Sequence, residues 1–293
     1  MRYFAEEIAS QPSCWRQAAL LAGELASVLP APGERVAVVG CGTSWFMAHA
    51  YAALRETLGA GETDAFAASE TPIGRAYDRV LAISRSGTTT EVLELLAQLH
   101  GQVPTLAVTA DPDTPLMTAA DEVVTLEFAD ERSVVQTRFA TSTLALLRTS
   151  LGQDLSRVVA DAETALSTEA DPALAEAEQI TFVGRRWTIG LAHEAALKLR
   201  ESCLAWAESY PAMEYRHGPI SIAAPGRAVW AFGDVPAGLR KEVDDAGAAF
   251  EHSELDPMAE LLRVHRICEV RAERLGIDPD RPRNLTRSVV LQG

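Results

Sequence analysis

Val36-Ala-Val-Val-Gly-Cys-Gly-Thr-Ser44 and Leu81-Ala-Ile-Ser-Arg-Ser-Gly-Thr-Thr-Thr90 are the two stretches that decide the fold. Each is a hydrophobic run that ends in glycine and hydroxyl side chains, the pattern of a buried parallel strand that leads into a helix. The free N–H groups and the positive dipole at the start of such a helix attract an anion, and Ser and Thr hydroxyls add donors. Two such turns at the carboxyl edge of one sheet predict a site for a single anionic group, with phosphate as the first candidate.

Composition limits the class of protein. The 293 residues are 47% hydrophobic, which is enough for one large or two ordinary domains with real cores. The net charge of -15, without basic blocks, argues against nucleic acid or an anionic membrane as a partner. The start lacks the apolar core of a signal peptide, and no run approaches membrane-spanning length. We therefore expect a cytoplasmic protein with reduced thiols at Cys14, Cys41, Cys203 and Cys268.

Strand-like runs alternate with helical patterns through the first half of the chain. The predicted strands are 35–39, 80–83, 104–109 and 122–128. The predicted helices are 1–29, with Ser13 as a candidate N-cap, 44–58, 89–100 and 137–151. Such alternation predicts βαβ units and a parallel sheet.

The second half repeats this pattern after a polar helix predicted over 152–178. The expected elements are strand 179–184, helix 189–208, strands 228–232 and 248–252, and helix 255–275. We predict an α/β protein of two similar tandem domains, each a parallel sheet flanked by helices in a three-layer sandwich. The predicted parts are an N-terminal helix (1–34), a first domain (35–165) and a second domain with a C-terminal tail (166–293).

The two glycine turns have a structural and a functional interpretation. A lone Gly-x-Gly is weak evidence, because in many α/β proteins it only permits close packing of helix on strand. The stretch 84–90 offers five hydroxyls and Arg85, which are suitable donors to a phosphate, although the same residues also suit the N-cap of a helix. The presence of both turns in one chain favours phosphate binding.

A second group of polar residues lies on the helix predicted from residue 189. Glu194, Lys198 and Glu201 fall on one face at 3.6 residues per turn. Such i,i+4 pairs are usually solvated surface pairs, so the residues alone favour a structural role. The following segment 206–219 contains His217, and a fixed carboxylate with a nearby His can supply a base and an acid for proton transfer on a sugar.

Five ordered motifs resemble the sugar isomerase (SIS) domain family, and within it the isomerase half of glucosamine-6-phosphate synthase. They are Cys41-Gly-Thr-Ser, Ser84-Arg-Ser-Gly-Thr-Thr, Glu194-Ala-Ala-Leu-Lys-Leu-Arg-Glu201, Glu214-Tyr-Arg-His-Gly-Pro219 and Pro282-Arg-Asn-Leu-Thr-Arg-Ser-Val289. The opening Phe4-Ala-Glu-Glu-Ile-Ala-Ser-Gln-Pro12 is also similar, so the resemblance covers essentially the whole chain. It implies two tandem, flavodoxin-like SIS domains.

The resemblance also implies roles for individual residues. Glu201 is the enolisation base that moves a proton between C1 and C2 of an open-chain hexose phosphate, and Lys198 lies beside those carbons. His217 assists ring opening from the neighbouring subunit, which makes a homodimer the active unit. The implied phosphate and substrate residues are Cys41, Gly42, Thr43, Ser44, Ser84, Arg85, Ser86, Thr89, Gln136 and Arg287.

Three departures from the synthase bear on the reaction. The glutaminase half is absent, so we expect no glutamine amidotransferase activity. Arg287 stands where the family has Lys, and because Arg stays protonated it cannot form a Schiff base, although it can fix a hydroxyl or an oxyanion. Gln136 and Arg138 stand where the synthase has a small residue and Lys, in a loop that borders the sugar, which leaves the substrate open.

The expected function is aldose–ketose isomerisation with loss of ammonia from a hexosamine 6-phosphate of the glucosamine 6-phosphate type. No cofactor or metal is implied, since the six histidines lack ligand spacing. Two alternatives use the same site: elimination of water from an N-acetylhexosamine 6-phosphate, and deglycation of a fructosamine phosphate. An alternative from another class is a non-catalytic phosphosugar sensor, against which the retention of Glu201 and His217 argues.

Overall fold

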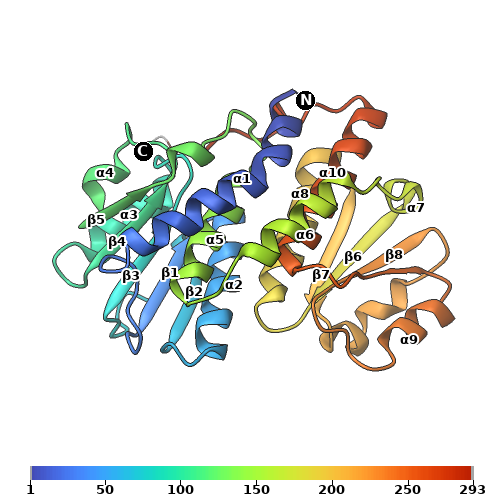
Figure 1. Cartoon of the computed structure of the whole chain (residues 1–293), viewed down its shortest axis with the longest axis horizontal. Helices are drawn as coiled ribbons and strands as arrows, with labels where there is room; N and C mark the ends of the chain where they lie inside the picture. Colours follow the sequence, from blue (N-terminus) through green and yellow to red (C-terminus); the bar gives the residue numbers. More distant parts are fainter. Residues whose placement is uncertain (1, 292–293) are drawn as a thin grey trace. The chain divides into compact units, whose positions relative to one another are not determined.

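Two parallel β-sheets organise the computed structural model, which describes residues 2–291. Each sheet lies in its own unit of the chain (Figure 1). The first unit comprises residues 13–132, 136–155 and 286–291, and the second comprises residues 2–12, 133–135 and 156–285. Two parallel sheets flanked by helices confirm the predicted α/β class. None of the helices within residues 2–291 is long and apolar enough to cross a membrane.

The sheet of the first unit has five parallel strands in the order β2-β1-β3-β4-β5. The strands are β1 (Val36–Gly40), β2 (Thr63–Ala67), β3 (Arg79–Ile83), β4 (Thr105–Thr109) and β5 (Glu122–Thr125). The helices are α2 (Thr43–Thr57), α3 (Thr90–Leu99), α4 (Leu116–Ala119) and α5 (Arg138–Ser150), with 3-10 turns at Ala68–Glu70 and Glu127–Ala129. Strands β1 and β4 are buried at every position, as their continuous apolar sequences predict for the middle of a parallel sheet.

The sheet of the second unit has four parallel strands in the order β7-β6-β8-β9. The strands are β6 (Gln179–Gly184), β7 (Trp206–Pro211), β8 (Arg227–Phe232) and β9 (Ala249–Glu251). The helices are α6 (Ser156–Ser167), α7 (Pro172–Glu176), α8 (Thr188–Cys203), α9 (Leu239–Asp245) and α10 (Pro257–Leu275), with 3-10 turns at Glu214–His217 and Pro219–Ile222. Helices α8 and α10 pack against each other (Figure 1). Counted along the chain, both sheets place their first four strands in the order second, first, third, fourth.

The first helix differs from its prediction. Helix α1 runs from Arg2 to Glu24, with Pro12 inside it, so the predicted N-cap at Ser13 is wrong. The helix continues through this position because Phe4, Ile8 and Trp15 are buried at helical spacing on both sides of it. Its residues 2–12 belong to the second unit, and its residues from 13 onward belong to the first.

Two other helix predictions are also corrected. The polar stretch 152–178 forms two helices, because Asp171 starts a new one by accepting a hydrogen bond from the backbone N–H of Ala173 at 2.8 Å. The helix predicted to reach residue 208 ends at Cys203, where Leu204 adopts φ +52°, and strand β7 follows directly. The division into 1–34, 35–165 and 166–293 stays a prediction, and its residues 1, 292 and 293 lie outside the described part of the chain.

Candidate active site

The two glycine turns of the first unit lie at the same edge of its sheet. Strands β1 and β3 are adjacent and parallel, and their last residues, Gly40 and Ile83, pair with each other. The turns after the two strands therefore start level with each other, as the sequence predicts. Gly40 is required because a Cβ at this position would lie 2.8 Å from the backbone carbon of Ser44. Helix α2 thus begins directly against the end of β1.

The first turn contains Cys41, Gly42, Thr43 and Ser44. Gly42 is the N-cap of α2 and has φ +55°, a conformation that glycine adopts without strain. Thr43 and Ser44 are buried in the first turn of α2. Burial, followed by the negative charge of Glu91, raises the pKa of the Cys41 thiol, so this cysteine is not an activated nucleophile.

The second turn, Ser84–Thr89, connects β3 to α3 and contains a buried hydroxyl that lacks a partner. Ser84 is 4% exposed, and its Oγ has no hydrogen-bond partner among residues 2–291. An unpaired buried hydroxyl costs about 1–3 kcal/mol, a cost that an acceptor on a ligand would remove. Ser86 accepts a hydrogen bond from the Thr88 backbone N–H at 3.3 Å, and Thr89 is the N-cap of α3. The turn therefore has the donors expected of a phosphate site.

Arg85 is buried in this second turn, and its guanidinium has partners on two sides. Its Nη2 donates to the backbone carbonyl of Arg287 at 2.9 Å, and its Nη1 lies 3.9 Å from Oε2 of Glu131. The side chains of Arg85 and Glu131 are 3% and 0% exposed. The Nη2 of Arg287 lies 2.5 Å from Oδ1 of Asp130, and its Nη1 donates to the carbonyl of Glu131. Arg85 and Arg287 thus both contact the Asp130–Glu131 dipeptide.

The loop after Glu131 carries the predicted substrate residue Gln136. The Oε1 of Glu131 accepts hydrogen bonds from the backbone N–H groups of Thr137 and Arg138 at 2.6 and 2.8 Å, at the start of α5. The Nε of Arg138 donates to the carbonyl of Asp130 at 2.9 Å. The Oε1 of Gln136 is buried and has no hydrogen-bond partner in the described part of the chain. The loop after Glu131 therefore contains a buried acceptor without a partner within residues 2–291.

The C-terminal segment 286–291 runs along the second turn. The hydroxyls of Thr88 and Ser288 lie 2.9 Å apart, and the backbone N–H of Thr90 donates to the carbonyl of Val289 at 3.1 Å. The backbone N–H of Leu291 donates to Oγ1 of Thr90 at 2.9 Å. These contacts fix the predicted residue Arg287 beside the turn.

Helix α8 of the second unit carries a buried lysine flanked by two carboxylates. The Nζ of Lys198 lies 2.5 Å from Oε2 of Glu201 and 3.4 Å from Oε1 of Glu194. This confirms the predicted common face. The side chains of Lys198 and Glu194 are 0% and 1% exposed, whereas that of Glu201 is 21% exposed. The group is therefore not a solvated surface pair, and Glu201 is the only one of the three that is partly exposed.

His265 on α10 is a buried neutral imidazole of the same unit. Its Nδ1 lies 3.0 Å from Nε2 of Gln11, and its Nε2 has no hydrogen-bond partner within residues 2–291. Burial, followed by the positive charge of Lys198, lowers the pKa of His265 to about 3. The imidazole therefore adds no charge near Lys198 at neutral pH.

The predicted site residues fall into two groups. The first unit contains Cys41, Gly42, Thr43, Ser44, Ser84, Arg85, Ser86, Thr89, Gln136 and Arg287, and the second contains Lys198, Glu201 and His217. His217 lies exposed at the end of the turn Glu214–His217, and its side chain has no hydrogen bond or ion pair with another described residue. The predicted roles of these residues stay predictions.

Sequence reasoning missed Glu131 and His265. Glu131 accepts from the backbone N–H of Thr137, six residues further on. A capping box joins residues only three apart, so its pattern does not indicate Glu131. His265 is a single histidine in an amphipathic helix, and no local signal distinguishes it from an ordinary core residue. Both residues gain their environment from segments that are distant in the sequence.

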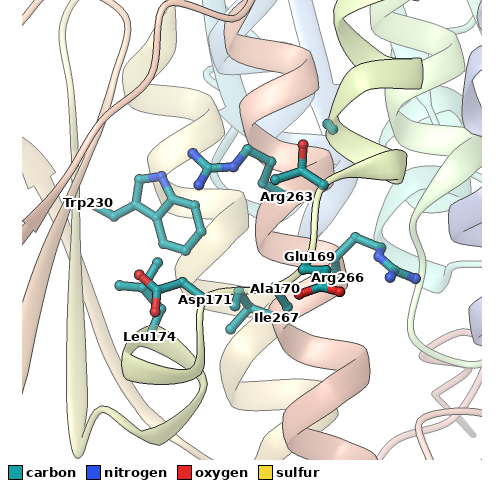
Figure 2. Close-up of a pocket in the computed structure, with 10 residues that line it drawn as sticks. Glu169, Ala170, Asp171, Leu174, Trp230, Arg263, Arg266 and Ile267 are labelled. Carbon is teal, nitrogen blue, oxygen red and sulfur yellow. The ribbon is translucent and has the colours of Figure 1, made fainter.

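A pocket in the second unit contains none of these residues (Figure 2). Its cavity of about 10 Å³ has room for about one water molecule. Arg263 lies over the ring of Trp230, with 5.3 Å between its Cζ and the ring centroid, and pairs with Glu251 and Glu260 at 2.6 and 2.8 Å. These contacts are structural, and the pocket is too small for a sugar phosphate.

Comparison with known proteins finds a family model that matches part of the first unit. The model of the SIS domain matches residues 31–151, which include both glycine turns and Gln136. Residues 31–151 are thus similar to a SIS domain. The SIS domain thus accounts for the sheet β1–β5 and for the turns at its carboxyl edge.

Relatives extend the likeness beyond the SIS domain. The chain is 28% identical to a glutamine–fructose-6-phosphate aminotransferase of Methanothermobacter thermautotrophicus over 99% of this chain and 58% of that protein. It is 26% identical to the enzyme of the same name from Sulfurisphaera tokodaii over 88% of this chain and 50% of that protein. The chain therefore spans about half the length of these curated relatives.

Solved structures match over nearly the whole chain. Glucosamine-6-phosphate deaminase from Thermotoga maritima has a TM-score of 0.78 and 25% identity, covering 99% of this chain and 100% of that chain. The C-terminal domain of glucosamine-fructose-6-phosphate aminotransferase from Francisella tularensis has a TM-score of 0.79 and 22% identity, covering 94% and 97%. The chain is thus similar over nearly its whole length to these two solved structures.

Proposed function

We propose that this chain is a phosphosugar isomerase that acts as a deaminase, converting glucosamine 6-phosphate and water to fructose 6-phosphate and ammonia. The observation that carries the proposal is the buried Lys198 flanked by Glu194 and Glu201 on α8. A carboxylate fixed by an ammonium is a group suited to moving a proton on carbon. The likeness to the Thermotoga maritima deaminase over the full length of both chains supports this reaction.

In the proposed enzyme the first unit holds the phosphate. The buried Oγ of Ser84 donates to a phosphate oxygen and gains the partner that it lacks. The backbone N–H groups and hydroxyls of both turns, with the Arg85 guanidinium, supply the remaining donors. This binding orients the substrate and contributes equally to ground state and transition state, so it lowers KM more than it raises kcat.

Glu201 is the proposed group for the proton transfer. Glu201 takes the C2 proton of the open-chain aldose, and the electron pair of the C–H bond forms the C1–C2 double bond. The former aldehyde oxygen takes up a proton from water, which gives an enaminol, the enediol-type intermediate of an amino sugar. Protonation at C1 then gives the 2-imine, and water hydrolyses the imine to the ketose and ammonia. Lys198 holds the Glu201 carboxylate in place during the transfer, at the 2.5 Å contact between Nζ and Oε2.

Three finer features belong to the proposal. The second unit is a second SIS domain, supported by the strand order that it shares with the first. The active unit is a homodimer in which the exposed His217 assists ring opening in the neighbouring subunit. The compartment is the cytoplasm, in keeping with the four free cysteines.

A panel of substrates tests the proposal. The purified protein is incubated with glucosamine 6-phosphate, galactosamine 6-phosphate and N-acetylglucosamine 6-phosphate, and ammonia release and product mass are followed. We expect ammonia from an amino sugar, lost in Glu201→Gln. Glu273→Gln, an exposed acid on α10, is the matched control and should retain activity.

The other outcomes identify the alternatives. A product lighter by one water, without ammonia, replaces the deaminase with a dehydratase. If none of these three sugars reacts, a fructosamine phosphate is added as a fourth substrate, and release of its amine replaces the deaminase with a deglycase. Binding of phosphosugars without turnover of any of them contradicts an enzyme and favours a sensor.

A further inference from the structure

We propose that Glu131 is a positioning residue of the phosphate-binding turn, which holds the Arg85 guanidinium in place for the bound phosphate. The inference rests on the proposed function, because it assumes that the turn Ser84–Thr89 binds a phosphate. It concerns a residue outside both groups of predicted site residues, and it follows from contacts made within the first unit.

Glu131 is fully buried, and its two oxygens face different partners. Its Oε1 accepts from the backbone N–H of Thr137 at 2.6 Å, from the hydroxyl of Thr137 at 2.9 Å and from the backbone N–H of Arg138 at 2.8 Å. Its Oε2 accepts from the backbone N–H of Phe139 at 3.3 Å and faces Arg85. A buried carboxylate needs such donors and a positive charge nearby. The first turn of α5 therefore fixes the carboxylate rigidly.

Arg85 is the positive charge that this carboxylate faces. The 3.9 Å between Nη1 and Oε2 is too long for a hydrogen bond, so the two groups attract each other by charge. The Nη2 of Arg85 is fixed separately by the carbonyl of Arg287 at 2.9 Å. The hydrogen bond to Arg287 and the charge of Glu131 both hold the guanidinium. The backbone carbonyl of Arg85 accepts from the backbone N–H of Ala110 and the hydroxyl of Thr109 at the end of β4.

This arrangement prepares Arg85 for an anion. A long side chain loses rotamer freedom when it binds a ligand, and this loss has an entropic cost. The cost is smaller when the side chain already adopts its ligand-bound position in the free protein. A guanidinium forms charge-assisted, often bidentate hydrogen bonds to phosphate. Because Glu131 acts through Arg85, its contribution to phosphate binding must disappear when Arg85 is absent.

A double-mutant cycle tests this dependence. Glu131→Gln keeps an oxygen that can accept from Thr137 and Arg138 but removes the charge that faces Arg85. We measure the Kd for inorganic phosphate by calorimetry, and KM and kcat for glucosamine 6-phosphate, for the original protein, Glu131→Gln, Arg85→Gln and the double variant. The matched control is Glu122→Gln, which removes a carboxylate 3.4 Å from Arg79, at the other end of the strands of the same sheet.

The expected result is non-additive. Each single variant raises the phosphate Kd and the KM about tenfold, the double variant is no worse than Arg85→Gln, and kcat changes less than about threefold. Glu122→Gln leaves the Kd within about twofold. Urea unfolding reports separately any loss of the α5 cap, which would lower stability in both backgrounds.

Two results overturn the inference and can be told apart. If the original protein binds phosphate but Glu131→Gln leaves its Kd unchanged, or weakens it equally with and without Arg85, Glu131 is only structural. If the original protein does not bind phosphate at all, the proposed function fails, and the inference fails with it.

Discussion

Replacing Ser84 by alanine is expected to make the protein more stable but weaker at binding phosphate. The Oγ of Ser84 is buried and has no hydrogen-bond partner within residues 2–291. Desolvating an unpaired hydroxyl costs about 1–3 kcal/mol, and Ser84→Ala removes that cost without altering the backbone. The free energy of unfolding without ligand should therefore rise by about 1 kcal/mol.

The sign of the effect reverses when phosphate is bound. The hydroxyl then donates to a charged oxygen, and such a hydrogen bond contributes about 1.5–3 kcal/mol. Its loss corresponds to a Kd that is about 10- to 150-fold higher. A group that destabilises the free protein and stabilises the complex is the signature of a ligand-binding residue, because a purely structural hydroxyl has no reason to behave in this way.

Urea unfolding and calorimetric phosphate binding measure the two effects. Ser142→Ala is the matched control, since Ser142 in α5 of the same unit is also fully buried with an Oγ that lacks a partner in the described chain. It should raise the unfolding free energy by a similar amount and leave the phosphate Kd unchanged. The reasoning is refuted if Ser84→Ala lowers stability without ligand and binds phosphate as tightly as the original protein.

Two further predictions concern the scaffold. Gly87→Ala should lower the unfolding free energy by about 1–3 kcal/mol more than Gly101→Ala does. Both glycines have positive φ, so the backbone strain is similar, but a Cβ at Gly87 would also lie 2.1 Å from Oγ1 of Thr114. Equal losses in urea unfolding would contradict this. The pKa of His265 is about 3 in the folded protein. Between pH 6.5 and 3, therefore, His265 is protonated only in the unfolded state. The unfolding free energy should fall by about 1.4 kcal/mol for each unit by which the pH drops. His265→Gln should remove that slope, whereas replacing the exposed His100 should not, and an unchanged slope in His265→Gln would contradict the assignment.

The central strands could be predicted from the sequence, but two edge strands could not. Strands β1, β3, β4, β6 and β8 are mostly apolar, as is typical of buried parallel strands. Strands β2 and β7 lie at the edges of their sheets and are only partly buried, so their polar residues hide the strand pattern. β7 was masked further by the apparent continuation of α8, which only the conformation of Leu204 ends. The short helices α4 and α9 also escaped prediction.

The candidate site could also be predicted only in part. The turns at Cys41–Ser44 and Ser84–Thr89 could be predicted because each consists of consecutive residues. The common face of Glu194, Lys198 and Glu201 could be predicted because helix geometry alone places these residues together. The burial of Lys198 is not local, since it depends on packing against α10. Glu131 likewise obtains its role from Arg85, which is far away in the sequence. Single-sequence reasoning has no access to such long-range contacts.

Exchange of carbon-bound hydrogen tests the central claim most directly. The protein is incubated with glucosamine 6-phosphate in D2O, and deuterium in the recovered sugar phosphates is measured by mass spectrometry, with phosphate binding measured in parallel. We predict deuterium on carbon with the original protein and at least about a 100-fold slower incorporation with Glu201→Gln, whose phosphate Kd stays within about twofold. Incorporation at an unchanged rate in Glu201→Gln would contradict Glu201 as the base, and no incorporation by an original protein that binds the sugar phosphate would contradict proton transfer on this substrate.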